Sequence, residues 1–266
     1  MRLHVEHRGA GPHALVLLHG FTGTAAAWDD LAPVLASGRR LVALDLPGHG
    51  RSDAPPAGAD LAAVADAVVA TVASAGVERA DWLGYSLGGR VALHVALRHP
   101  ARVDRLVLES ASPGLADPAA RAARAAADDA LADALERDGL AAFVERWLAQ
   151  PLFATQARLS PAVRARERAR RLAQAPTALA AALRATTVGR QGPLLGALAT
   201  LRRPVLLVAG AEDAPYRAHA AAMAARLPDA RVAIVPDAGH ATHLENPAAF
   251  RAAVEAFLDR AAPPAA

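Results

Sequence analysis

The sequence predicts an α/β fold with a mostly parallel, doubly wound sheet and an inserted helical lid. Three observations indicate this fold. Short continuous apolar runs alternate with helical stretches, one long segment has helical spacing without any strand-like run, and hydrophobic residues make up 53% of the 266 positions. A chain of this length and composition suits one α/β domain with an insertion rather than two equal domains.

The strands are predicted from six short apolar runs. Each run is apolar on both faces, as expected for parallel strands that helices cover on both sides. The runs are residues 14–18, 41–44, 80–83, 106–108, 204–209 and 232–235. Residues 2–6 are expected to add an antiparallel edge strand.

The helices of the predicted core come from segments with apolar residues at helical spacing. These segments are residues 61–75, 90–98, 217–227 and 248–258. No internal repeat is visible.

Residues 115–191 interrupt the alternation of strands and helices. The segment is rich in Ala and Arg, is punctuated by proline, and contains the apolar anchors Phe143, Trp147, Leu152 and Phe153. We expect a lid of several short helices here, inserted into a core formed by residues 1–114 and 192–266.

The pentapeptide Gly84-Tyr85-Ser86-Leu87-Gly88 is the most informative motif. G-x-S-x-G forms a tight strand-to-helix turn that exposes one serine hydroxyl above the sheet. Chance copies of the pentapeptide are common, but here a strand-like run precedes it and a helical segment follows. Ser86 is therefore the predicted nucleophile or proton carrier.

Two further polar residues follow predicted strands, where functional residues of such sheets gather. Asp213 comes after the fifth run and His240 after the sixth. The chain order Ser, Asp, His is that of a triad in which the imidazole accepts the serine proton and the acid fixes its tautomer. Glu212 could replace Asp213, or Asp213 could be only a helix N-cap. His243 competes with His240, although it could merely bond a backbone carbonyl.

An oxyanion hole is expected beside Ser86. One donor would be the backbone N–H of Leu87, and the second the N–H of Phe21, in a loop where Gly20 and Gly23 allow close approach. Residues 45–52 form a similar rigid loop, which we expect to shape the site from below without a catalytic role.

Composition and charge argue against several classes of function. The chain has no cysteine, and its histidines are not clustered with carboxylates at ligand spacing, so neither a metal nor an organic cofactor is predicted. The formal net charge is only +3 and the arginines are interleaved with acids, which argues against nucleic-acid binding. Without a secretory pattern or a long apolar stretch, we expect a cytoplasmic enzyme with no membrane insertion.

Four motifs together resemble the α/β-hydrolase superfamily over nearly the whole chain. They are residues 19–23, residues 45–50, the pentapeptide, and Gly239-His240. A narrower resemblance, to the 2-succinyl-6-hydroxy-2,4-cyclohexadiene-1-carboxylate synthases of menaquinone biosynthesis, extends into the lid. The residues that carry this narrower resemblance are 84–93, 109–115, Trp147, 150–153 and 239–247.

The narrower resemblance implies a lyase that removes pyruvate from 2-succinyl-5-enolpyruvyl-6-hydroxy-3-cyclohexene-1-carboxylate. Ser86 would relay a ring proton to His240 while charge develops on the succinyl carbonyl. The substrate carries three carboxylates, and arginine suits such groups. Arg90 lies one helical turn after Ser86 and can point into the cleft, or it could form a salt bridge that holds the lid.

The resemblance also implies substrate contacts from Tyr85, Arg124, Trp147 and Arg171. Arg121 and Arg170 are the alternatives to the two lid arginines, and Arg171 could equally lie on a solvated helix face. The sequence departs from the family after the acid, where Tyr216 stands in a segment that commonly carries a lysine.

Two other functions compete with the lyase. One is a hydrolase of the same fold, such as a carboxylesterase, a lactonase or a carbon–carbon bond hydrolase. The other is a non-catalytic ligand-binding protein. Several carboxylate-binding arginines favour the lyase, whose partner would be a small tricarboxylate. We expect a monomer or a small homo-oligomer.

Overall fold

Seven strands form one sheet, and only the first runs against the others. The computed structural model describes residues 1–259, and the strand order across the sheet is β1-β3-β2-β4-β5-β6-β7. β1 pairs antiparallel with β3, whereas every other pair is parallel. The strands are β1 (Val5–Arg8), β2 (His13–Leu18), β3 (Arg39–Leu44), β4 (Ala80–Tyr85), β5 (Val103–Glu109), β6 (Val205–Gly210) and β7 (Ala230–Val235). The mostly parallel sheet and its antiparallel edge are therefore confirmed.

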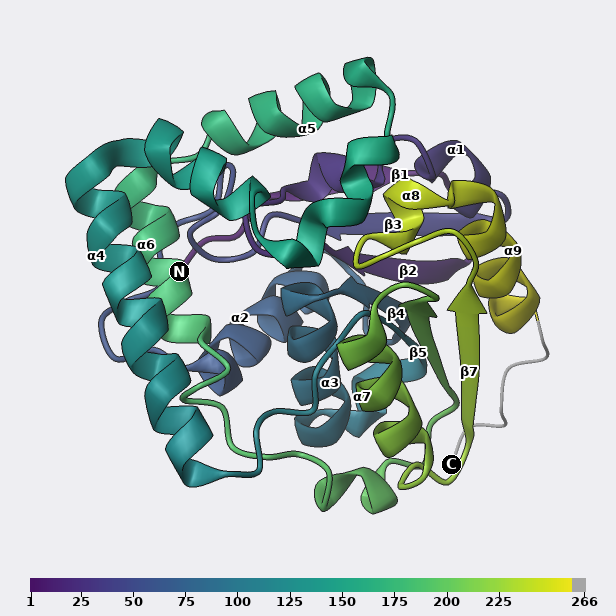
Figure 1. The fold of residues 1–266 in the computed structure, drawn as a ribbon. Coiled ribbons are helices and arrows are strands. Elements are labelled where there is room, and N and C mark those ends of the chain that lie inside the picture. Colours follow the sequence, from purple (N-terminus) through teal and green to yellow (C-terminus); the bar gives the residue numbers. More distant parts are fainter. Residues whose placement is uncertain (260–266) are drawn as a thin grey trace.

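Helices cover both faces of the sheet (Figure 1). One face carries α2 (Leu61–Ser74), α3 (Leu87–Arg98) and α7 (Ala214–Ala224), and the other carries α1 (Ala32–Leu35) and α9 (Pro247–Leu258). Neighbouring β2 residues show why the apolar runs are continuous, because Val16 packs into the first layer and Leu17 into the second. The short elements are η1 (Ala25–Trp28), η2 (Pro100–Arg102), η4 (Ala197–Thr200) and α8 (Thr242–Glu245).

The edge strand β7 departs from the prediction that every strand is covered on both sides. Val232 and Ile234 are 44% and 46% exposed. β7 has a paired neighbour only on the β6 side. A central strand buries alternate residues under both helix layers, whereas these two residues at the sheet edge stay partly open to solvent.

The predicted lid, residues 115–191, contains helices and no strand. Its elements are α4 (Pro118–Leu148), η3 (Pro151–Arg158), α5 (Pro161–Leu172) and α6 (Pro176–Thr186). Each begins with proline, which suits a first helical position because the missing N–H has no intrahelical partner there. α4 spans 31 residues but is divided at Gly139, whose φ of 83° and ψ of 168° are not helical, so it consists of two shorter helices that meet at a kink, in line with the expectation of several short helices.

α4 and α6 lie side by side and enclose a small core of their own (Figure 1). Leu135 and Phe143 from α4 pack there with Leu179 and Leu183 from α6. The division of the chain into a core and a lid stays a prediction, and residues 260–266 of the predicted core lie outside the described residues.

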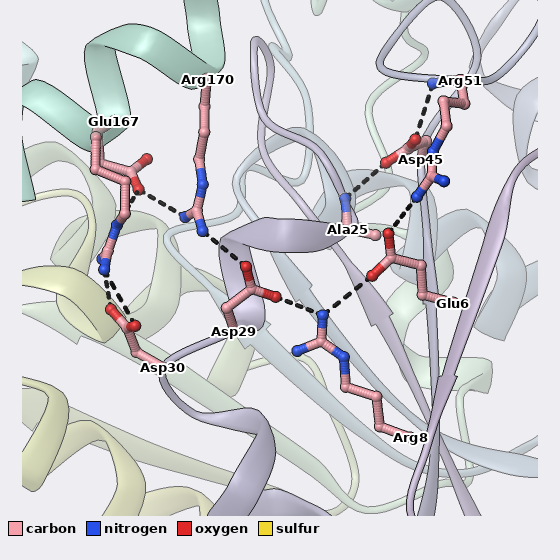
Figure 2. Close-up of polar contacts among 10 residues, drawn as sticks. Glu6, Arg8, Ala25, Asp29, Asp30, Asp45, Arg51, Glu167 and Arg170 are labelled. Atoms are coloured by element: carbon pink, nitrogen blue, oxygen red, sulfur yellow. Dashed lines mark hydrogen bonds and ion pairs between the residues drawn. The ribbon is translucent and has the colours of Figure 1, made fainter.

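Helix α5 is seated on the core through ion pairs (Figure 2). Arg170 of α5 donates to Asp29 at 2.8 Å, and Asp29 also accepts from Arg8 of β1 at 2.5 Å. Glu167 of α5 pairs with Arg170 at 2.8 Å. The lid is therefore connected to the first strand of the sheet through side chains of alternating charge.

Candidate active site

Ser86 lies in a strained turn between β4 and α3. Its backbone has φ 52° and ψ −108°, a conformation that costs energy for a residue with a side chain. A Cβ on Gly84 would lie 2.3 Å from the Gly88 carbonyl oxygen, and a Cβ on Gly88 would lie 2.2 Å from that of Leu18. Only glycine therefore fits on either side of the serine, and the turn holds the Ser86 hydroxyl at the carboxyl end of β4.

The structure brings Ser86, His240 and Asp213 together. His240 Nε2 lies 3.0 Å from Ser86 Oγ, and His240 Nδ1 lies 2.8 Å from Asp213 Oδ2. His240 and Asp213 are almost fully buried. With the Nδ1–H donating to the carboxylate, Nε2 is left to accept a proton from the serine. The arrangement can therefore move a proton from the hydroxyl to the imidazole.

The competing residues are placed elsewhere. Glu212 pairs with Arg158 at 2.6 Å on the surface and does not reach His240. Asp213 stands at the N-terminus of α7 but makes no capping hydrogen bond with its side chain. A Cβ on Gly210 would lie 2.1 Å from the Gly239 carbonyl oxygen, so the end of β6 lies directly against the loop that carries His240.

A second buried pair, which the sequence did not predict, lies next to this loop. Glu109, at the end of β5, accepts from Thr242 Oγ1 at 2.6 Å and contacts His243 Nδ1 at 2.9 Å. His243 thus bonds a carboxylate rather than a backbone carbonyl. Glu245 accepts from the backbone N–H groups on both sides of His240, those of Gly239 and Ala241. The loop is therefore fixed by two carboxylates.

Phe21 and Leu87 both line the cavity beside Ser86. A Cβ on Gly20 would lie 2.6 Å from the Tyr85 ring and 3.5 Å from Ser86 Cβ, which places the 19–23 loop against the turn. Within residues 1–259, neither the Phe21 nor the Leu87 backbone N–H has a hydrogen-bond partner. Both N–H groups are therefore available for an oxyanion.

A cavity of about 200 Å³ opens onto Ser86. Every site residue predicted from the sequence lines it, except Asp213, which lies behind His240. Lining residues that were not predicted as part of the site include Asp128, Gln150, Phe153, Thr187, Tyr216 and His219. Tyr216 packs on His240 with ring centroids 4.4 Å apart. Its position three residues after Asp213, on the same helix face, is a signal that could have found it.

Arg90 enters the cavity without a carboxylate partner among the described residues. Its Nε donates to Gln191 Oε1 and its Nη2 to the carbonyl oxygen of Thr186, each at 2.7 Å. Burial lowers the pKa of the Arg90 guanidinium to about 10. Arg90 therefore does contact the end of the lid, as one alternative had it, but through neutral acceptors rather than a salt bridge. No carboxylate among residues 1–259 is in contact with its positive charge.

The two lid arginines do have counter-charges. Arg124 Nε lies 2.9 Å from both carboxylate oxygens of Asp128. Arg171 Nη1 lies 3.4 Å from Glu167 Oε2. Both arginines line the cavity.

The alternative lid arginines are turned elsewhere. Arg121 donates to the carbonyl oxygens of Leu115 and Ala116, and Arg170 pairs with Asp29 and Glu167. Neither lines the cavity.

Trp147 closes the cavity on the lid side. Its indole Nε1 is buried and has no hydrogen-bond partner among the described residues. Its ring stacks on Phe143 at 5.8 Å and lies 5.2 Å from Phe21. An indole N–H that is buried without an acceptor is available to a bound polar group.

Residues 1–259 hold no group of three or more His, Asp or Glu side chains that could bind a metal ion. Within the same range, no helix is both long enough and apolar enough to cross a membrane.

Comparisons with known proteins identify the family of this chain. The family model of the alpha/beta hydrolase fold matches residues 13–247. A protein of Klebsiella pneumoniae (strain 342) named 2-succinyl-6-hydroxy-2,4-cyclohexadiene-1-carboxylate synthase is 38% identical over 254 residues, which cover 96% of this chain and 97% of that protein.

Two solved structures are also similar over almost the full length. MenH from S. aureus has a TM-score of 0.92 at 29% identity, covering 96% of this chain and 97% of that chain. A hydrolase from Pseudomonas aeruginosa PA01 has a TM-score of 0.82 at 33% identity, covering 97% of this chain and 94% of that chain.

Proposed function

Because this chain belongs to the α/β-hydrolase family, and within it to the 2-succinyl-6-hydroxy-2,4-cyclohexadiene-1-carboxylate synthases, we propose that it forms this product by eliminating pyruvate. The substrate is 2-succinyl-5-enolpyruvyl-6-hydroxy-3-cyclohexene-1-carboxylate. Ser86, His240 and Asp213 supply the proton transfer, and the product keeps two of the three carboxylates.

The observation that carries this proposal is the unpaired charge of Arg90. Burying a guanidinium without a carboxylate is costly, and such a cation is retained where an anionic ligand completes the pair. Arg90 lies one helical turn from Ser86, on the same helix α3. A carboxylate bound to Arg90 would therefore hold its ring close to the serine hydroxyl.

The triad acts as a base in this mechanism. Ser86 Oγ takes the ring proton as its own proton passes to His240 Nε2, and Asp213 stabilises the imidazolium. The electrons of the broken C–H bond move toward the succinyl carbonyl, whose oxygen accepts from the N–H groups of Phe21 and Leu87.

The leaving group then departs. The ring C–O bond breaks, the ring gains its second double bond, and enolpyruvate takes up a proton at carbon to become pyruvate. Ser86 already carries the ring proton and forms no covalent bond to the substrate, so the proton on His240 Nε2 passes to the departing enolate, and no water molecule has to attack the enzyme.

The test is to mix the enolpyruvyl substrate with the protein and to measure pyruvate. We expect Ser86→Ala and His240→Ala to lower kcat by about 10³-fold or more, the scale of losing a triad member. Quenching of Trp147 fluorescence should show that both variants still bind substrate. Full pyruvate release by Ser86→Ala would contradict the mechanism.

A hydrolase is the second candidate, because the 3.0 Å contact between Ser86 and His240 suits attack on an ester equally well. A p-nitrophenyl ester assay separates the two functions. Rapid ester turnover without pyruvate release would favour the hydrolase, whereas pyruvate release with slow ester turnover supports the lyase.

A further inference from the structure

The segment from Thr186 to Gln191 holds two arginines of the cavity that come from different parts of the chain. Thr186 and Gln191 accept from Arg90 of the core helix α3. Between them, Thr187 donates to Asp128, and Asp128 binds Arg124 of the lid helix α4. One short segment therefore sets the positions of both guanidinium groups.

Asp128 is unusual among the carboxylates of the lid. It is only 4% exposed and it lines the catalytic cavity. Its two oxygens accept from Arg124 Nε at 2.9 Å, and Oδ2 accepts from Thr187 Oγ1 at 2.5 Å. Among the described residues, Arg124 is its only ion-pair partner. A carboxylate in a cavity for anions opposes substrate binding unless it serves another purpose.

The contacts suggest what that purpose is. The guanidinium of arginine is planar, and its two Nη groups can grip a carboxylate side by side. Asp128 uses only the Nε–H of Arg124, and neither Nη atom is bonded to any described residue. The two Nη groups of Arg124 therefore stay free, while the contact of Nε with Asp128 fixes the plane of the guanidinium.

We propose that Asp128 is a positioning residue for substrate binding, which acts by holding the Arg124 guanidinium so that its Nη fork meets a substrate carboxylate. Thr187 supports it by fixing the orientation of the Asp128 carboxylate. This inference rests on the proposed function and deepens it, because it explains how a 49% exposed side chain keeps one orientation at the cavity.

An ordinary surface ion pair between residues four apart on a helix would contribute little. Burial of Asp128 and its bond from Thr187, 59 residues away in sequence, distinguish this pair from such a contact. The pair of Arg171 and Glu167 differs from the pair of Arg124 and Asp128, because Glu167 also pairs with Arg166 and Arg170.

The experiment is a double-mutant cycle in the full-length protein, with pyruvate release as the readout. We expect Asp128→Asn to raise KM about tenfold, the scale of one well-placed hydrogen bond to a charged group, with kcat nearly unchanged. In the Arg124→Ala background the same substitution should not raise KM, because no guanidinium is left to hold and a negative charge that opposes the substrate is removed.

Asp129→Asn is the matched control. Asp129 is the next residue of α4, and its carboxylate pairs at 2.5 Å with Arg190, which follows α6. The control removes a lid ion pair outside the cavity and should leave KM unchanged. Should Asp128→Asn fail to fold, Thr187→Val tests the same point, since it should raise KM while Thr187→Ser retains the wild-type value.

The outcomes separate the two claims. An Asp128→Asn variant with unchanged or lower KM, or with the same rise in KM in both backgrounds, would overturn the positioning role. Absence of pyruvate release by the wild-type protein would instead overturn the proposed function.

Discussion

At the scale of single residues, the site contains a buried charge that lowers the stability of the fold but binds the substrate. Arg90 holds its charge in a partly buried position without a carboxylate, and the lowered pKa of its guanidinium reflects the cost of this burial. Residues of this kind are retained for function rather than for folding, and their replacement often leaves a protein more stable. The two properties can be measured separately.

We predict that Arg90→Met raises KM for the tricarboxylate about 100-fold, because a charge-assisted carboxylate contact is lost. The melting temperature should not fall, because methionine keeps the apolar stem without the buried charge. Steady-state kinetics and calorimetry measure the two effects. Arg121→Met, outside the cavity, serves as the control. A strong fall in melting temperature with unchanged KM would assign Arg90 a structural role instead.

At the scale of elements, helix α5 depends on charge for its attachment to the core (Figure 2). None of its residues is fully buried, so hydrophobic packing contributes little to its position. Asp29 lies between Arg170 of the lid and Arg8 of the sheet and joins them. Because α5 also carries Arg171, this attachment bears on the cavity.

We predict that Asp29→Asn lowers stability by about 1 kcal/mol, or about 2–4 °C in melting temperature, because two partly buried pairs are broken. High salt should reduce the difference from the wild type, since it already screens these pairs. Asp30→Asn is the control, because Asp30 is more exposed and, among residues 1–259, pairs only with Arg166. An equal, salt-independent effect of both substitutions would contradict the prediction.

The elements could largely be predicted from local pattern. Continuous apolar runs identify central parallel strands because such strands are buried on both faces, and β2 through β6 lie within a few residues of the predicted ranges. The same rule failed for β7, because only the sheet order shows that it is an edge strand. The prolines of the lid predict where α4, η3, α5 and α6 begin, but not the break within α4, which falls at Gly139 where no proline stands.

At the scale of the whole molecule, two loops of the core, residues 19–23 and 45–52, contain buried neutral histidines. His19 accepts from the Leu46 backbone N–H at 2.9 Å, and its ring lies 5.0 Å from that of His49. Burial lowers the pKa of His19 to about 4 and that of His49 to about 3. On acidification the unfolded chain therefore takes up protons first, so stability is lost as the pH falls below about 6.5.

We predict that each of these two histidines removes about 2 kcal/mol of unfolding free energy between about pH 7.5 and about pH 5. His49→Asn removes one titrating group and keeps a donor for the Pro47 carbonyl oxygen. Its loss of stability on acidification should be about 2 kcal/mol smaller than that of the wild type, as measured by urea unfolding at both pH values. An identical loss in both proteins would contradict the assignment.

The catalytic residues could be predicted from the sequence, but the residues that hold them in position could not. Ser86, Asp213 and His240 follow strands, so topology alone places them at one sheet edge. Asp128 has no such signal, and Glu109 has it without any indication of its partners. Asp128 is one of many acids on an Arg-rich helix, and its partner Thr187 lies 59 residues away. Glu109 ends a strand as the triad members do, but its partners lie 133 and 134 residues further on.

The segment that joins Arg90 to Arg124 makes the cationic part of the site separable from its proton-transfer part. Ser86, His240 and Asp213 follow β4, β7 and β6, so the pairing of these strands in one sheet brings them together. The cationic half is complete only after residues 186–191 have reached both α3 and α4. Loss of the contacts of this segment with either helix would therefore remove the capacity to retain a tricarboxylate and leave the proton-transfer geometry in place. Substrate, by binding both arginines, would stabilise the docked position of the segment.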